Sequence, residues 1–210
     1  MIIIREVKTE FEFKESENLL KDVFNEIYQF KYEEINRKTS QFNKIIFNAY
    51  DEKSNEIIGT ITLSMSSEGN KFPSNEFFGF VTPAKFQNQR IVEMGRLVKK
   101  LNIENSILDK MVYISLLLTV KKYSIKHNVD RWIASVHTPL MNNIKQLGIP
   151  LVEIDKKDTV RNKLSNFMGK YVNDVNFISA SMYDSYIALE KFQYLIDNKS
   201  ISILISESQD

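Results

Sequence analysis

The amino-acid sequence predicts a mixed α/β protein in which a sheet is flanked by helices on both faces. Short β-rich segments alternate with longer amphipathic segments along the chain, which is the pattern of a layered fold. Residues 44–64 contain two β-rich runs around a polar turn, typical of an antiparallel hairpin. The most apolar segment, "ILDKMVYISLLLTVKKYSI", carries apolar residues on nearly every side of a helix. Such a helix is buried on more than one face, so we expect it to lie in the core.

Composition narrows the class of protein. The chain has 210 residues without a linker rich in Gly, Pro or Ser, so we expect one domain over residues 1–210. Its 28 basic and 27 acidic residues nearly balance, which gives no general attraction to nucleic acid. With no cysteine and two histidines, disulfides and thiolate catalysis are excluded and no metal centre is expected.

Two apolar segments bear on the location of the protein in the cell. The N-terminal "MIIIREVKTEFEF" has an apolar run shorter than that of a signal peptide and reaches Arg5 at once, so it predicts a first strand. The most apolar segment is interrupted by Asp109, Lys110, Lys121 and Lys122, and it falls short of the ~20 apolar residues that cross a bilayer. We therefore expect a cytoplasmic protein without a membrane span.

The remaining elements follow from periodicity and capping. "ESENLLKDVFNEIYQF" predicts a helix with Ser16 as its N-cap. "RIVEMGRLVKKLNI" predicts a strand, followed by a helix from about Ser106 to His127. "DRWIASVH" predicts another strand, and Pro139 then opens a short helix that Gly148 closes.

Other segments are less regular. "SSEGNKFPSN" is a loop, and the aromatic stretches "EFFGF" and "TPAKFQNQ" continue it as short, irregular structure. "PLVEI" and "NDVNFISASM" predict two strands, and "YIALEKFQYLID" predicts a late helix. Residues 156–174 show no pattern that favours one structure.

The strand "RIVEMGRLVKKLNI" places Glu93 and Arg96 in an apolar frame, where charges are paired, hydrated or functional. The run from Glu93 to Leu97, Glu-x-x-Arg-Leu before a long helix, resembles the corresponding strand of acyltransferases of the GNAT superfold. The resemblance is to the branch that contains long-chain N-acyl amino acid synthases and acyl-homoserine-lactone (autoinducer) synthases. It spans roughly residues 24–154.

Three further segments carry the resemblance. "IYQFKYEEI" is similar to an Arg-Tyr run near the end of the family's first helix, with Lys31 in place of Arg and followed by Tyr32. "EIIGTITL" is similar to the family strand Ile-Gly-Thr-x-Arg-Leu, with Thr62 where Arg is usual. "ASVHTPLMNNIKQLGIPLVEI" resembles the strand, Pro, helix and Gly-Ile segment that follows.

The resemblance implies a GNAT-like, mostly antiparallel twisted sheet with splayed central strands. It also implies an N-acyltransferase that moves a fatty acyl group from an acyl carrier protein or acyl-CoA thioester to the amine of an amino acid or related small acceptor. No cofactor would be bound permanently. The alternatives are an acetyl-CoA-dependent acetyltransferase and, given the Lys31 and Thr62 replacements, a non-catalytic GNAT-like sensor or interaction module. The oligomeric state is not indicated.

The loop after the central strand indicates which acyl donor the protein would use. Family members that use coenzyme A generally have a Gly-rich pyrophosphate loop, whereas this chain has "KKLNIENS" without glycine. A helix N-terminus with Asn105 or Ser106 as its cap can still receive a phosphate, but a loop without glycine approaches a pyrophosphate less closely. This favours the phosphopantetheine arm of an acyl carrier protein over acyl-CoA. We expect this co-substrate to contact Leu97, Lys99, Asn105 and Ser106.

Glu93 and Arg96 are the catalytic candidates. Glu93 would take a proton from the acceptor amine, since partial burial raises the pKa of a carboxyl group. Its alternative role is that of a carboxylate held by backbone amides without a catalytic function. Arg96 stays protonated and would organise the fold or a carboxylate ligand. Strand alternation sends the two side chains to opposite faces unless a bulge intervenes, and a bulge near Leu97 would also expose an oxyanion donor.

Further candidates would bind substrates. The resemblance points to Lys31 and Tyr32, and Phe78, Phe80 and Trp132 are candidates to line an acyl tunnel, although aromatic residues mostly build core. His137 follows a strand close to the expected cleft, where its alternative role is structural. Lysines between residues 99 and 126 could steer an acidic carrier protein, or they are solvated helix ends.

Overall fold

The computed structural model describes residues 1–28, 32, 33, 36, 41–66, 71–79, 82–154 and 175–205, except for the side chains of residues 28, 76 and 77. Eight strands of this part form one sheet in the order β6-β7-β5-β4-β3-β2-β1-β8. The pairs β4–β5 and β1–β8 are parallel and the others antiparallel. The strands are β1 (Ile2–Glu6), β2 (Lys44–Asp51), β3 (Ile57–Met65), β4 (Ile91–Lys99), β5 (Arg131–His137), β6 (Val152–Glu153), β7 (Val175–Ser181) and β8 (Ile201–Leu204).

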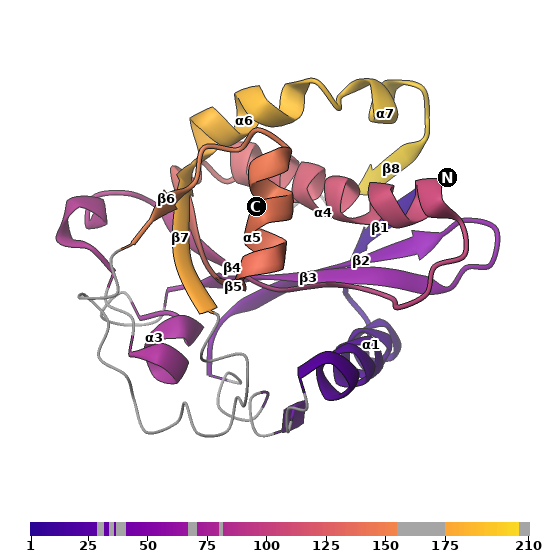
Figure 1. Ribbon diagram of the computed structural model, residues 1–210, viewed down its shortest axis with the longest axis horizontal. Coiled ribbons are helices and arrows are strands. Elements are labelled where there is room, and N and C mark those ends of the chain that lie inside the picture. The colour runs from indigo at the N-terminus through magenta and orange to yellow at the C-terminus, as the bar shows by residue number, and fades with distance from the viewer. Residues whose placement is uncertain are drawn as a thin grey trace.

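Helices cover both faces of this sheet, as the sequence predicted (Figure 1). One face, called here the α1 face, is covered by α1 (Glu10–Tyr28) and α3 (Pro73–Phe78). The opposite α4 face is covered by α4 (Ser106–Lys126), α5 (Thr138–Gln146), α6 (Met182–Glu190) and α7 (Tyr194–Asp197). A short 3₁₀ helix spans Ala84–Phe86. Among the described residues no helix is both long and apolar enough to cross a membrane.

The α4 face holds the main hydrophobic core. Alternate strand residues such as Phe47, Ile61, Met94 and Trp132 pack there against buried residues of α4. α4 lies between the sheet and α6 and is buried over much of its circumference, which confirms the core helix that the sequence predicted. Leu116, in its middle, is fully buried.

The start of α1 differs from the prediction. Ser16 is not an N-cap but lies inside the helix, fully buried, where its hydroxyl donates to Asn48 Oδ1 at 2.8 Å. The cap is formed by Thr9 and Glu12, because the amide of Glu12 donates to Thr9 Oγ1 at 3.2 Å and the amide of Thr9 donates to Glu12 Oε2 at 3.0 Å. This is a capping box, and its sequence signal, Thr-x-x-Glu, begins seven residues, about two helical turns, before the expected N-cap Ser16.

The C-terminal region also differs in detail. The predicted late helix is divided into α6 and α7, with a turn between them. β8 was not predicted. It is only four residues long and pairs in parallel with β1, so its partner lies at the other end of the chain and no local pattern indicates it.

The two central strands separate after a short paired stretch. β4 and β5 are in register at Ile91–Arg131, Val92–Trp132 and Glu93–Ile133, whereas both strands continue beyond these pairs. The splayed central strands that the resemblance implied are therefore confirmed. The gap between them opens on the C-terminal side of Glu93.

Candidate active site

A cavity of about 190 Å³ occupies the gap between β4 and β5. β4 lines it with Met94 to Lys99 and β5 lines it with Ser135 to His137. Helices from both layers complete the wall, with residues Val23, Phe24, Ile27, Tyr113 and Leu140, together with Leu101 of the loop after β4. This seam cavity therefore reaches both faces of the sheet.

A β-bulge shapes the β4 side of the cavity. Thr60 pairs with Val98 and Thr62 pairs with Gly95, so two residues of β4, Arg96 and Leu97, oppose the single residue between the two threonines. Arg96 has φ 51°, in the left-handed region that costs a residue other than glycine roughly 1–2 kcal/mol. Because the bulge inserts one residue, the side chain of Arg96 points to the α1 face, the face of Glu93. Strand alternation alone predicted opposite faces for Glu93 and Arg96, and the bulge places both side chains on one face.

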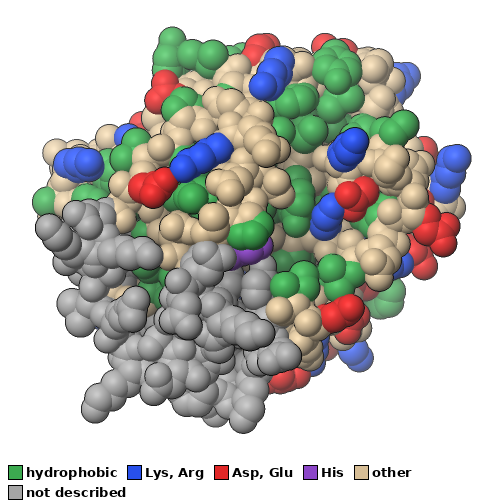
Figure 2. Space-filling view, in the orientation of Figure 1, with side chains coloured by type: hydrophobic (Ala, Val, Ile, Leu, Met, Phe, Trp, Pro, Cys, Tyr) green, Lys and Arg blue, Asp and Glu red, His purple; other side chains and the backbone are tan. Residues whose placement is uncertain are grey.

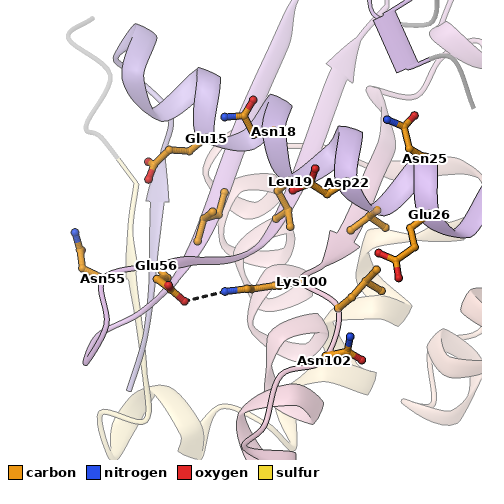
Figure 3. Close-up of a pocket in the computed structure, with 13 residues that line it drawn as sticks. Glu15, Asn18, Leu19, Asp22, Asn25, Glu26, Asn55, Glu56, Lys100 and Asn102 are labelled. Carbon is orange, nitrogen blue, oxygen red and sulfur yellow. Dashed lines mark hydrogen bonds and ion pairs between the residues drawn. The ribbon is translucent and has the colours of Figure 1, made fainter.

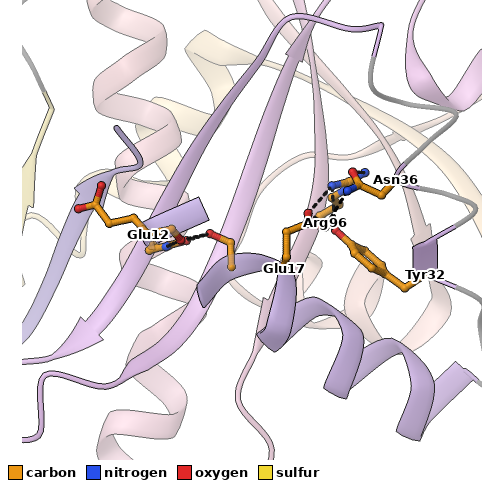
Figure 4. A network of polar contacts seen from close by, with 7 residues as sticks. Glu12, Glu17, Tyr32, Asn36 and Arg96 are labelled. Carbon is orange, nitrogen blue, oxygen red and sulfur yellow. Dashed lines mark hydrogen bonds and ion pairs between the residues drawn. The ribbon is translucent and has the colours of Figure 1, made fainter. Parts of the chain in front are cut away.

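Arg96 is held on the α1 face by a network of hydrogen bonds (Figure 4). Its Nη1 donates to Tyr32 Oη at 2.9 Å and its Nη2 donates to Asn36 Oδ1 at 3.1 Å. Tyr32 in turn donates to Glu17 Oε1 at 2.6 Å, and Glu17 lies 3.5 Å from Arg96 Nη1. Burial is the main cause that raises the pKa of Tyr32 above its usual value. Tyr32 and Arg96, both picked out from the sequence, are thus brought together, and Glu17 of α1 is the partner that the sequence did not reveal.

Glu93 lies on the same face but has different partners. It is 6% exposed and accepts hydrogen bonds from the Ser74 amide at 3.0 Å and the Ser74 hydroxyl at 2.9 Å. Burial raises the pKa of Glu93 to about 7, although the hydrogen bonds from Ser74 act in the opposite direction. A carboxyl group with this pKa exchanges protons near neutral pH, which is what a general base needs. The hydrogen bond from the Ser74 amide is also what the alternative, structural role of Glu93 would require.

The strands beside Glu93 continue this polar layer under α1. Thr60, Thr62 and Ser64 of β3 alternate along the strand and are all buried. Lys44 of β2 pairs with Ser64, which in turn pairs with Glu93. Burial, followed by the charge of Arg96, lowers the pKa of Lys44 to about 7. Sequence reasoning missed Lys44, although the polar alternation of "GTITLS" was visible.

The N-terminus of α4 has the cap that the sequence predicted. Asn105 is the N-cap, and its Oδ1 accepts from the amides of Ile107 at 3.0 Å and Leu108 at 3.1 Å. Ser106 is exposed, and Lys99 forms an ion pair with Asp109 in the first turn. Two of the amides that would receive a phosphate are therefore already bonded to the protein.

The comparisons with known proteins bear on this geometry. The model of a protein family described as N-acyl amino acid synthase FeeM matches residues 22–147. The chain belongs to this FeeM family. It is accordingly an acyltransferase, and the interaction module without catalysis is set aside. The matched residues include the C-terminal part of α1 and all of β4, β5 and α4, the elements that surround the seam cavity. A comparison with curated proteins finds no match.

Solved structures agree on the fold. The N-acyl amino acid synthase FeeM from uncultured soil microbes superposes with a TM-score of 0.67 and 12% identity, over 92% of this chain and 98% of that one. The acyl-homoserine-lactone synthase LasI gives a TM-score of 0.60 with 11% identity, covering 99% of this chain and 98% of that one. A GNAT acetyltransferase from Staphylococcus aureus Mu50 gives 0.53 with 12% identity, over 85% and 99% of the two chains. The GNAT-like fold is confirmed.

Of the residues predicted to line an acyl tunnel, the two that the structure describes, Phe78 and Trp132, lie in different hydrophobic clusters. Trp132 lies in the core of the α4 face, and its Nε1 donates to Ser185 Oγ at 3.1 Å. Phe78 contacts Phe177 edge to face, with ring centroids 5.4 Å apart, in a second cluster beneath α3. Neither residue lines the seam cavity, because β5 turns Trp132 toward the α4 face and Phe78 belongs to α3, where it packs against Phe177 of β7. His137 does line it, while Lys31 and Phe80 lie outside the described residues.

A wider groove adjoins the seam cavity. It measures about 930 Å³ and runs between α1, the β2–β3 turn and the loop after β4 (Figure 3). Val23 and Leu101 line both spaces, so the groove and the seam cavity are neighbours. The groove carries four carboxylates and one lysine, which are Glu15, Asp22, Glu26, Glu56 and Lys100. Lys100 donates to Glu56 at 2.8 Å, so its charge is already balanced. The remaining carboxylates make the groove negative, and a negative groove repels a phosphate.

The lysines that were candidates for docking a carrier protein are mostly engaged. Lys99 pairs with Asp109, and Lys121 is nearly buried and lies 2.7 Å from Glu190. Lys122 donates to the carbonyl of Ile203 at 3.1 Å. On the face drawn in Figure 2, basic side chains stand singly or beside acidic ones and form no continuous basic patch. Within the described residues no cluster of His, Asp and Glu suited to a metal ion occurs.

Proposed function

We propose that this protein transfers a fatty acyl group from the thioester of an acyl carrier protein directly to the amine of an amino acid or related small acceptor. The observation that carries the proposal is the seam cavity, since β4 and β5 pair at only three positions and then enclose a space that reaches both faces of the sheet. A thioester arm entering between the strands would meet an acceptor approaching from the α1 face.

The reaction needs a base, and Glu93 suits this role. The acceptor amine arrives largely as an ammonium ion and must lose a proton before its nitrogen attacks the thioester carbon. The C–N bond then forms, the C–S bond breaks, the thiol leaves with a proton, and one proton is released overall. Glu93 lies on the acceptor face, and burial raises its pKa to about 7, so its carboxylate can accept that proton near neutral pH.

The tetrahedral intermediate carries a negative oxygen, and the bulge supplies a donor for it. A bulged residue leaves its backbone groups outside the regular ladder. Arg96 and Leu97 lie opposite a single residue of β3, and both residues line the seam cavity. We assign the oxyanion to an amide at this bulge, where a fixed donor stabilises the developing charge.

The arrangement at α4 favours a carrier protein over acyl-CoA. A pyrophosphate needs several free amides at a helix N-terminus, but Asn105 already accepts from Ile107 and Leu108. The acidic groove beside the cavity offers no substitute. The arm of a carrier protein has only one phosphate, at the protein surface, so it needs fewer free amides from this loop than a pyrophosphate does.

The proposal is tested by incubating the purified protein with acyl carrier thioesters and acyl-CoAs of several chain lengths, each with a panel of amino acids. Mass spectrometry would detect the N-acyl products. We expect amide formation with at least one acyl carrier protein thioester. Transfer from acyl-CoA alone would overturn the donor assignment, and the absence of product from every pair would overturn the function.

A further inference from the structure

Gly95 leaves an opening on the α1 face of β4. A Cβ built on Gly95 would meet no described atom within 4 Å, although the residue lies in the middle of an eight-stranded sheet. Gly95 also lines the seam cavity. The chain has no unusual backbone requirement at this position, since its φ is not positive. The missing side chain therefore creates room rather than relieving strain.

Thr62 lies directly across from this opening. It pairs with Gly95 between β3 and β4 and shares its face of the sheet. It is 2% exposed, and its Oγ1 has no hydrogen-bond partner among the described residues. A buried hydroxyl without a partner costs roughly 1–3 kcal/mol. The neighbouring Thr60 avoids that cost because its hydroxyl donates to the carbonyl of Phe47 at 3.2 Å.

Two basic side chains lie near the same place. Arg96 follows Gly95 in the chain, and Lys44 belongs to β2, next to β3, with its side chain near Arg96. Lys44 pairs with Ser64, two residues from Thr62, so the side chains of Lys44 and Thr62 lie on the same face of the sheet. An anionic group in the opening would thus have a hydroxyl donor beside it and two basic side chains nearby, one of which, Arg96, has Glu17 as its partner.

We propose that Thr62 and Gly95 form the subsite for the acceptor, with the Thr62 hydroxyl donating a hydrogen bond to the acceptor's carboxylate and Gly95 providing the space. This inference rests on the proposed function and names the residues that select the acceptor. It assigns the subsite to amines that carry a carboxylate. The donor thioester lies on the other side of Gly95, between the strands.

Two substitutions test the subsite. Thr62→Val has nearly the same shape and removes only the hydroxyl, and Gly95→Ala fills part of the opening. We expect each to lower kcat/KM for the acceptor by about tenfold to a hundredfold, while KM for the acyl thioester stays within about twofold. Both proteins should fold, because the first loses an unpartnered hydroxyl and the added methyl group of the second meets no described atom.

Thr60→Val is the matched control. It removes a hydroxyl from the same strand and the same face, but one that bonds to the backbone. We expect it to lower the melting temperature and to leave KM for the acceptor unchanged. Thr62→Val should show the reverse, with an unchanged or higher melting temperature and weaker acceptor binding. If Thr62 had only a structural role, its replacement would not weaken acceptor binding while leaving the melting temperature unchanged or higher.

The measurements are steady-state kinetics and thermal shifts with L-amino acids and their carboxamides, in the intact protein. We expect an amino acid, but not its carboxamide, to raise the melting temperature of the wild type, and expect Thr62→Val and Gly95→Ala to abolish this shift. An active wild type whose two variants keep the acceptor KM would overturn the subsite and leave the proposed function standing. A wild type that transfers nothing would overturn the function itself.

Discussion

Gly59 and Gly95 lie on neighbouring strands, yet their surroundings are opposite. A Cβ at Gly59 would lie 2.5 Å from Val112 Cγ1 and 3.2 Å from Leu116 Cδ1 of α4, whereas a Cβ at Gly95 would touch nothing described within 4 Å. The first glycine lets a helix approach the sheet closely. The second leaves an opening beside the candidate active site.

The same contrast holds for the two faces as a whole. On the α4 face the strands contribute Ile61, Leu63, Val92 and Met94 to one apolar core. On the α1 face the same two strands contribute Thr60, Thr62, Ser64, Glu93 and Arg96. A buried polar layer is costly unless its groups are bonded, so it persists where those groups have a use. One face of the sheet thus holds the main apolar core, and the other holds the buried polar groups on which the proposed chemistry depends.

Replacing Glu93 by Gln should have the largest effect. The amide keeps an oxygen that can accept from Ser74 but cannot take a proton, so we expect kcat/KM to fall by about 10²–10⁴-fold. Steady-state kinetics with the best substrate pair would measure the loss. Full activity in this variant would exclude Glu93 as the base.

In the wild type, the stability that depends on the protonation of Glu93 should change with pH in the opposite sense to the activity, and Glu93→Gln should lack this change. Burial raises the pKa of Glu93 from 4.5 to about 7, so between these values the folded state binds more protons than the unfolded state, and the free energy of unfolding falls as pH rises. Urea unfolding at pH 5 and pH 8 should show that Glu93→Gln lacks this component and is the more stable protein at pH 8. An identical pH dependence in both proteins would contradict the raised pKa.

Leu116→Ala tests the apolar face. Leu116 is fully buried in α4, and truncating such a side chain costs about 2–5 kcal/mol of unfolding free energy. We expect denaturant unfolding to show this loss, while kcat/KM per folded molecule stays within about threefold. A large loss of activity in the folded variant would show that the two faces are not separate.

Gly59→Ala should destabilise the protein by about 1–3 kcal/mol, because the methyl group overlaps Val112. Val112→Ala removes the obstructing atom, so the double variant should be more stable than the sum of the two single effects predicts. Thermal unfolding of the four proteins would measure the coupling. Additive effects would mean that the overlap with Val112 is not what destabilises Gly59→Ala.

The smallest expected effect comes from the backbone strain at Arg96 in the bulge. Arg96→Ala and Arg96→Gly both remove the guanidinium from Tyr32 and Asn36, but only glycine adopts φ 51° without strain. We expect the glycine variant to be about 1 kcal/mol more stable than the alanine variant. Chemical unfolding of the pair measures this difference, and equal stabilities would show that the bulge relaxes when the side chain is lost.

Local patterns in the sequence determined much of this protein. The hairpin, the core helix α4 with its Asn105 cap, and the strand carrying Glu93 and Arg96 all follow from periodicity and capping within a few residues. The order of short motifs pointed to the family. These features involve neighbours in the chain, so the sequence shows them directly.

The site depended on contacts between distant segments, which only the tertiary structure decided. The bulge at Arg96 arises from pairing with β3, and Glu17 meets Arg96 across 79 positions of the chain. Trp132 belongs to the core rather than to the cavity because alternation along β5 turns it toward α6, and no composition argument reveals which face a strand presents. A strand's pattern specifies that it has two different faces, but the layers packed against it decide which one becomes the core and which one the site.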